Sequence, residues 1–155
     1  MKNKTEIVLC LEADDVQEIK WYMDASFGTH NDMQSHIESI FKLGNGAIWN
    51  DCTKQNVNAR ISTEVELISI DNKISKIIWM KSFIESQRFD IDLNILNQDN
   101  RSTIRLAENG KKSSGKRTRH FDIKYFYFTD LKNQKEVSLK NCSSNNMLAN
   151  DHPKP

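Results

Sequence analysis

Two acidic features of the sequence have the residue types and positions of a metal site. Asp24 interrupts the strand-like run KWYMDASFGTH, and a pair of glutamates opens the next long amphipathic segment, ISTEVELISI, from Ile61 to Ile70. Divalent ions such as Mg²⁺ prefer carboxylate oxygens, and two ions about 4 Å apart need several such oxygens that converge from different elements. The two features therefore indicate carboxylates placed to hold metal.

Each of these acids also has an ordinary structural explanation. Asp24 lies on the strand face opposite the apolar residues, so it is suited to face solvent. Glu66 follows Thr63 at the spacing of a capping box, in which the glutamate bonds back to the start of its helix. Glu64 is an acid in the first helical turn, which the helix dipole favours. From the residues alone, both interpretations of Asp24 and Glu66 stay open.

The hydrophobic pattern predicts the elements that must position these acids. Apolar residues take the odd positions over 19–27, which is typical of a half-buried strand. GNG at 44–46 is hairpin chemistry between a strand that begins at His36 and a return strand over Trp49–Val57. Over 62–87 apolar residues recur at intervals of three, four or seven, which predicts an amphipathic helix of about twenty residues.

The remainder of the chain is predicted to alternate between helix and strand. The expected elements are a strand over 90–99 that ends at Asp99, a helix over 100–109 stopped by Gly110, a short strand over 136–142 and a helical start after 143, with 121–136 ambiguous between helix and strand. Three consecutive strands followed by this alternation predict an α/β fold with a mixed sheet. The aromatic residues are expected in its core: Trp21, Tyr22, Trp49 and Trp79.

Length and charge limit the classes of protein. The 155 residues fit one domain, and a formal charge of +1 gives no overall polyanion-binding character. Six bases against one acid over 111–124 are a local signal for an anionic partner. The three cysteines lack any zinc-binding spacing, which favours free thiols, and the short apolar run at the start is no membrane span. An intracellular protein without a membrane partner is expected.

Several motifs, in order and spacing, resemble the ribonuclease H domain of copia-type LTR-retrotransposon Pol polyproteins. They are WYMDASFGTH, SHIESIFKLGNGAI, TKQNVNARISTEVELISID, NQDNRSTIRLAENGKKSSGKRTRHFDIKYFYFTD and NNMLAN. The similarity extends from about Leu11 to Pro155. It implies that 1–18 are the end of the tether from reverse transcriptase and that 19–155 form a ribonuclease H-like domain, with a five-stranded mixed sheet flanked by helices.

The resemblance also implies an activity and a set of site residues. The expected reaction is hydrolysis of the RNA strand of RNA–DNA hybrids with two Mg²⁺ or Mn²⁺ ions, and the expected partners are the hybrid and the reverse transcriptase domain of an intact polyprotein. Asp24, Glu66 and Asp99 match the family's catalytic, metal-binding acids. Asp99 followed by Asn100 is also typical of a helix cap. Retroelement reverse transcription implies a cytoplasmic location, with later nuclear entry.

The basic run 111–120 fits this picture as a phosphate-binding segment. Lys116, Arg117, Arg119 and His120 are expected to contact the nucleic-acid backbone without reading its sequence. A solvated charged loop is the simpler alternative. For His120, a catalytic base is the alternative to phosphate binding or capping of the following helix.

The sequence departs from the family at the last acidic motif. Asn150 stands where the family has its fourth metal-binding aspartate, and Asp151 is one residue further on. Asparagine offers a neutral carbonyl oxygen, and a shift by one residue rotates a side chain by about 100° on a helix. Both residues are candidate ligands. Glu38 also stands where the family usually has a glycine. These departures lead to a second hypothesis, in which the protein is an inactive relic that keeps the fold and at most binds nucleic acid.

Overall fold

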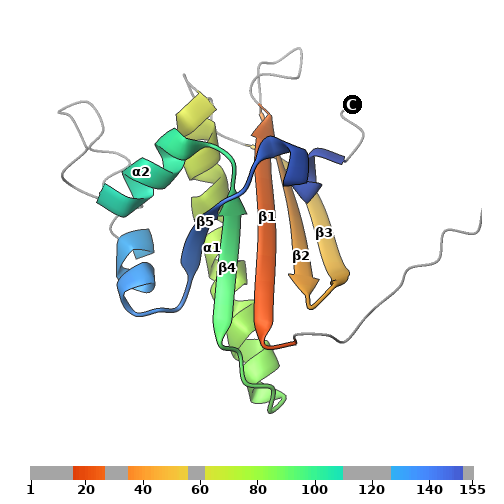
Figure 1. Cartoon of the computed structure of the whole chain (residues 1–155). Helices are drawn as coiled ribbons and strands as arrows, with labels where there is room; N and C mark the ends of the chain where they lie inside the picture. Colours follow the sequence, from red (N-terminus) through yellow and green to blue (C-terminus); the bar gives the residue numbers. More distant parts are fainter. Residues whose placement is uncertain (1–15, 27–34, 56–61, 110–126, 152–155) are drawn as a thin grey trace, which may run out of the picture.

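A computed structural model describes residues 16–26, 35–55, 62–109 and 127–151 (Figure 1). The elements run in the order β1 (Glu18–Ser26), β2 (His36–Leu43), β3 (Gly46–Lys54), α1 (Ser62–Ser86), β4 (Leu93–Gln98), α2 (Arg101–Asn109), β5 (Ser138–Asn141), η2 (Ser144–Asn146) and η3 (Leu148–Asp151). Residues 127–133 are also helical, which resolves the ambiguity of that part of the chain in favour of helix.

One five-stranded sheet has the order β3-β2-β1-β4-β5. The pairs β1–β2 and β2–β3 are antiparallel, whereas β1–β4 and β4–β5 are parallel. Parallel neighbours need a crossover connection, and α1 and α2 lie in the chain segments that precede β4 and β5. The predicted mixed α/β sheet of three antiparallel strands followed by alternating helices and strands is confirmed.

The hairpin between β2 and β3 forms at the predicted glycines. Leu43 pairs with Gly46, so the loop has two residues, and Gly44 takes a φ of 58°, the left-handed region that glycine enters at little cost. The return strand begins at Gly46, three residues before the predicted start at Trp49. The strand starts early because a two-residue loop allows pairing to resume at once.

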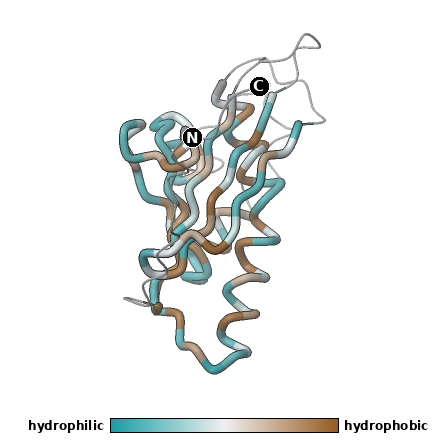
Figure 2. Tube along the Cα trace, turned by 90° about the vertical axis from the view of Figure 1, so that its right-hand side faces the viewer, coloured by the Kyte–Doolittle hydropathy of each residue, from teal (hydrophilic) through white to brown (hydrophobic). Residues whose placement is uncertain are grey.

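The strand β1 alternates as its sequence predicts. Ile19, Trp21, Met23 and Ala25 are buried, and the residues between them are partly exposed. The buried face packs with apolar residues of α1 such as Ile70, Ile74 and Ile77. Hydrophobic and hydrophilic residues alternate along the strands and along α1 in Figure 2.

The expectation for the four aromatic residues is only partly correct. Trp21 is fully buried and stacks on Phe41 at 4.6 Å between ring centroids. Trp49 and Tyr22 are partly buried. Trp79 was expected in the core, but 58% of it is exposed, and it stacks on Phe83. The helix α1 is long enough for its outer face to carry apolar residues that the sheet does not cover.

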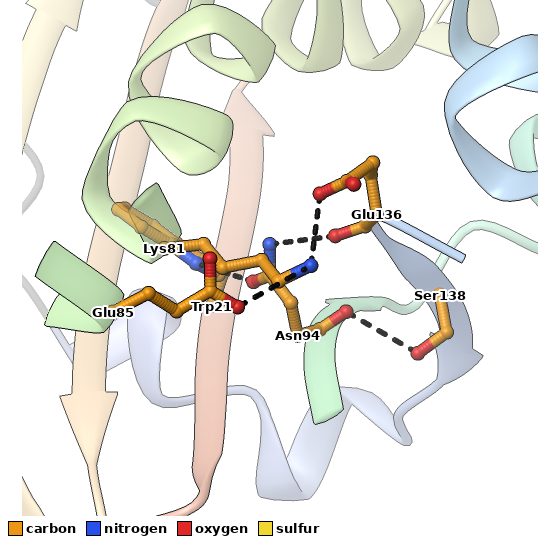
Figure 3. Close-up of polar contacts among 6 residues, drawn as sticks. All are labelled: Trp21, Lys81, Glu85, Asn94, Glu136 and Ser138. Atoms are coloured by element: carbon orange, nitrogen blue, oxygen red, sulfur yellow. Dashed lines mark hydrogen bonds and ion pairs between the residues drawn. The ribbon is translucent and has the colours of Figure 1, made fainter. Parts of the chain in front are cut away.

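A partly buried polar network joins β1, β4, β5 and α1 (Figure 3). The Trp21 indole N–H donates to Asn94 Oδ1 at 3.1 Å, and Asn94 Nδ2 donates to the backbone oxygen of Glu136 at 3.0 Å. The Glu136 carboxylate accepts from Lys81 of α1 at 2.8 Å, and the Ser138 hydroxyl donates to the Asn94 backbone oxygen. The side-chain amide of Asn94 thus uses its oxygen to bind Trp21 and its nitrogen to bind Glu136, both of which are far away in the sequence.

Replacing Asn94 by leucine is expected to lower the free energy of unfolding by about 2–3 kcal/mol. The Trp21 N–H and the Glu136 carbonyl would each lose a buried partner, and an orphaned buried polar group costs roughly 1–3 kcal/mol. Urea unfolding measures the loss as a lower midpoint at unchanged slope. A loss below about 0.5 kcal/mol, the size typical of surface substitutions, would show that the network contributes little.

The C-terminal segment forms two short 3₁₀ turns rather than the helix expected after residue 143. The second turn, η3, contacts β1 and β2; its Ala149 is buried, and so is Met147 directly before it. Figure 1 shows η3 in front of the sheet and α1 behind it. This segment therefore covers the face of β1 opposite α1, the face on which Asp24 lies.

Cys52 and Cys142 are free thiols, as expected, while Cys10 lies outside the described residues. Among the described helices, none has both the length and the apolar composition needed to cross a membrane.

Candidate metal centre

Three carboxylates that are far apart in the sequence meet at one edge of the sheet. Asp24, Glu66 and Asp99 each offer an oxygen, and these oxygens lie within 4.8 Å of one another. Asp24 belongs to β1, Glu66 to α1, and Asp99 directly follows β4. The structure thus brings together the three acids singled out from the sequence.

The pairing of β1 with β4 explains why the two aspartates meet. These strands are parallel neighbours, and Tyr22 pairs with Asn97. Asp24 and Asp99 each lie two residues beyond this pair, so they occupy equivalent positions where the two strands separate. The carboxyl ends of parallel strands lie at one edge of a sheet, which is where polar sites of α/β folds commonly form.

Glu66 reaches this edge from the first turns of α1 and is held there by two donors. Gln98 Nε2 donates to Glu66 Oε2 at 2.8 Å, and the Ala25 backbone N–H also donates to the carboxylate. The helix begins at Ser62, so Thr63 lies inside it rather than at the N-cap position. The capping-box interpretation of Glu66 is therefore wrong, because its carboxylate is directed at β1 and β4.

Burial, together with the smaller effect of the negative charges of Asp24 and Asp99, raises the pKa of Glu66 to about 8. The hydrogen bonds from Gln98 and Ala25 oppose this shift without cancelling it. Only 3% of Glu66 is exposed. A carboxylate among other carboxylates resists ionisation in this way unless a cation offsets the charge.

Asp99 is oriented by the C-terminal segment and is not the cap of α2. The Ser144 hydroxyl donates to Asp99 Oδ2 at 2.9 Å. Asn100 Oδ1 accepts from the backbone N–H groups of Ser102 and Thr103 at 3.0 and 3.2 Å, as an N-cap side chain does. The capping function thus falls to Asn100, which leaves the Asp99 carboxylate available to the cluster.

The donor set fits a hard divalent cation. Carboxylate oxygens from three elements are the ligands that Mg²⁺ and Mn²⁺ take, whereas sites for softer metals use thiolate or imidazole. A bound cation would also offset the negative charges of Asp24 and Asp99, which add to the effect of burial in raising the pKa of Glu66. The charge and the chemistry of the cluster therefore agree on the class of ion.

The structure describes only some of the remaining predicted site residues. The backbone of Asn150 and Asp151 belongs to η3, which contacts β1 and β2, while their side chains lie outside the description. Lys116, Arg117, Arg119 and His120 also lie outside the described residues. Glu38 is buried and pairs directly with Asp24 across β1 and β2.

Sequence reasoning missed the residues that orient the acids. Gln98 and Ser144 each donate to a carboxylate of the cluster, and neither belongs to a motif that singles it out. For Gln98 one signal was present, because a polar side chain directly before Asp99 at the end of a buried strand needs hydrogen-bond partners.

Comparison with known proteins agrees with this fold. No family model matches the chain. The chain is 25% identical over 146 residues to the Retrovirus-related Pol polyprotein from transposon TNT 1-94 of Nicotiana tabacum. The match covers 94% of this chain and 11% of the polyprotein, so the chain spans about a tenth of that relative's length.

The solved structures that the chain resembles include ribonuclease H enzymes. LC11-RNase H1, isolated from compost by a metagenomic approach, matches with a TM-score of 0.60 and 11% identity over 87% of this chain and 91% of that chain. The same enzyme in complex with RNA/DNA hybrid matches with a TM-score of 0.60 and 10% identity over 86% and 92%. The protease–reverse transcriptase of prototype foamy virus matches with a TM-score of 0.54 and 9% identity over 81% of this chain and 17% of that one.

These matches define the class as a ribonuclease H-like fold. Within that class, the chain resembles a segment of a retrotransposon Pol polyprotein, and the resemblance to a retroelement ribonuclease H domain is confirmed.

Proposed function

We propose that the protein is a retrotransposon-derived ribonuclease H that hydrolyses the RNA strand of RNA–DNA hybrids with two Mg²⁺ or Mn²⁺ ions. The observation that carries this proposal is the meeting of Asp24, Glu66 and Asp99 within 4.8 Å at the edge of a ribonuclease H fold. One structural relative is an RNase H1 solved in complex with RNA/DNA hybrid, which supports this class of substrate.

The three carboxylates would hold the ions at the point where the scissile phosphate lies. Bound divalent ions supply an activated water and offset the charge of the leaving oxygen in an in-line displacement. Asp24 and Asp99 fix the site to the ends of two paired strands, and Glu66 adds a third ligand from α1. Ser144 and Gln98 hold Asp99 and Glu66 in position, so that little reorganisation is needed when substrate binds.

Cleavage of a labelled RNA–DNA hybrid by the purified full chain tests the proposal. Activity in Mg²⁺ or Mn²⁺, with loss of activity in EDTA, is the expected result. A protein that is folded by circular dichroism and cleaves in neither metal would contradict it.

The second candidate is a relic that keeps the fold and binds nucleic acid without cleaving it. Asn150 favours it, because a neutral side chain at the position of the fourth acid no longer offsets metal charge. Hybrid binding without cleavage in the same experiment would identify this state.

We also propose that the basic segment contacts the phosphates of the hybrid. Replacing Lys116, Arg117 and Arg119 together by alanine is expected to weaken hybrid binding and to lower the slope of log K against log salt by about 2–3, since each phosphate contact contributes roughly 0.7–0.9. Fluorescence anisotropy at several salt concentrations measures this slope. The control is Arg88→Ala. Arg88 lies just beyond the C-terminal end of α1, whereas Glu66 lies near its N-terminal end. An unchanged slope in the triple variant would show that the segment is merely solvated.

A further inference from the structure

We infer that Gln98 is the positioning residue that sets the separation of Glu66 and Asp99 and thereby the affinity of the site for divalent cations. Its side-chain amide bonds to the Glu66 carboxylate and, at the same time, to the backbone N–H groups of Asp99 and Asn100. Nε2 donates to Glu66 Oε2 at 2.8 Å, and Oε1 accepts from the Asp99 backbone N–H at 2.8 Å and from the Asn100 backbone N–H at 3.4 Å.

The position of Gln98 makes this bridge rigid. It is the last residue of β4, it is 0% exposed, and its backbone oxygen accepts from the Cys142 N–H at 2.9 Å. The strand pairing therefore fixes the backbone of Gln98, and burial restricts its side chain. The side chain of Gln98 is bonded to α1 at one end and to the turn after β4 at the other. Because Gln98 is held rigidly, it fixes the distance between Glu66 on α1 and Asp99 in that turn.

The chemistry of the amide suits this role in a way that other side chains do not. Glu66 needs a donor, and the N–H groups of Asp99 and Asn100 need an acceptor. A single amide offers both, whereas a carboxylate only accepts and an ammonium group only donates. Glutamine also has the length to span the two, which asparagine lacks by one methylene group.

The consequence concerns metal binding, and this inference rests on the proposed function. A cation site binds tightly when its ligands are already at the right separation before the ion arrives. Without the bridge, repulsion between the carboxylates of Glu66, Asp24 and Asp99 would drive them apart in the free protein. Substitutions of residues that orient metal ligands typically weaken metal affinity by about 10- to 100-fold.

The test is the affinity for Mn²⁺, measured by electron paramagnetic resonance titration of the full chain. Gln98→Met, which keeps an unbranched side chain in the core, is expected to raise the Mn²⁺ dissociation constant by about 10- to 100-fold. The matched control is Asn94→Leu, which removes another buried bridging amide from the same strand but in a different network. Its dissociation constant is expected to equal that of the unmodified protein.

Two further variants separate positioning from loss of fold. Gln98→Asn keeps an amide in the buried position but is too short to join both partners, so it is expected to weaken Mn²⁺ binding as well. In a Glu66→Gln background, Gln98→Met is expected to have a much smaller effect than in the unmodified protein, because one end of its bridge no longer holds a metal ligand.

The outcomes distinguish this inference from the proposed function. If the unmodified protein does not bind Mn²⁺, the proposed function fails. If it binds Mn²⁺ and the folded Gln98 variants bind equally well, the positioning role is overturned while the proposed function stands. Equal weakening by Gln98→Met and Asn94→Leu would also overturn it, because a general loss of stability would then explain both.

Discussion

Asp24→Asn is expected to abolish cleavage of an RNA–DNA hybrid, reducing the rate by at least about 10²-fold, the size of effect that follows removal of one group stabilising transition-state charge. The substituted amide keeps the shape of the side chain but loses the charge that offsets a divalent ion. Asp24 is partly exposed, so the fold should survive the change. Single-turnover cleavage in saturating Mg²⁺ and in Mn²⁺ measures the effect.

A matched aspartate outside the cluster provides the control. Asp90 lies exposed between α1 and β4, and Asp90→Asn is expected to leave the rate unchanged. Asp99→Asn should match Asp24→Asn, and the double variant should be little worse than either, because residues that act as a unit are strongly non-additive. If Asp24→Asn retained most of its activity, the carboxylate cluster would not be the catalytic site.

Glu66→Gln is expected to have opposite effects on activity and on stability. Activity should fall as for Asp24→Asn, since a metal ligand is lost. In the absence of metal the variant should instead be more stable than the unmodified protein at alkaline pH. The reason is that the pKa of Glu66 is raised to about 8 by burial and by the charges of Asp24 and Asp99.

The sign of the pH dependence follows from the two states of the chain. In the unfolded chain Glu66 ionises near its ordinary pKa of about 4.3, and in the folded protein it holds its proton up to pH of about 8. Between these values the folded state binds more protons, so its stability falls as the pH rises. At about 1.4 kcal/mol per pH unit, the loss reaches roughly 3–5 kcal/mol by pH 9.

Urea unfolding in EDTA at pH 5 and at pH 9 measures this prediction. The stability gained through Glu66→Gln should be small at pH 5 and should grow toward pH 9. With divalent metal present at pH 9, the unmodified protein should instead be more stable than Glu66→Gln, because only the unmodified protein has the full set of metal ligands. A gain that is the same at both pH values would show that Glu66 already ionises normally in the metal-free protein.

Much of the fold could be predicted because its signals are local. The alternation along β1, the glycines of the β2–β3 hairpin and the spacing of apolar residues in α1 depend only on neighbours in the chain. The errors occurred where contacts from elsewhere decide the outcome. Trp79 has an apolar side chain in an amphipathic helix, yet no described element covers it. The segment after residue 143 is expected to start a helix, yet it forms two 3₁₀ turns, the second of which contacts β1 and β2.

The sequence by itself determined which acids form the carboxylate cluster, since the resemblance singled out Asp24, Glu66 and Asp99 before any contact was known. Only the tertiary structure shows that the three carboxylates lie together. The parallel pairing of β1 with β4 places Asp24 beside Asp99, and Gln98 turns Glu66 away from its own helix start toward the sheet. Hydrogen bonds between residues distant in the chain leave no local pattern, and the raised pKa of Glu66 arises from burial that exists only once the chain has folded.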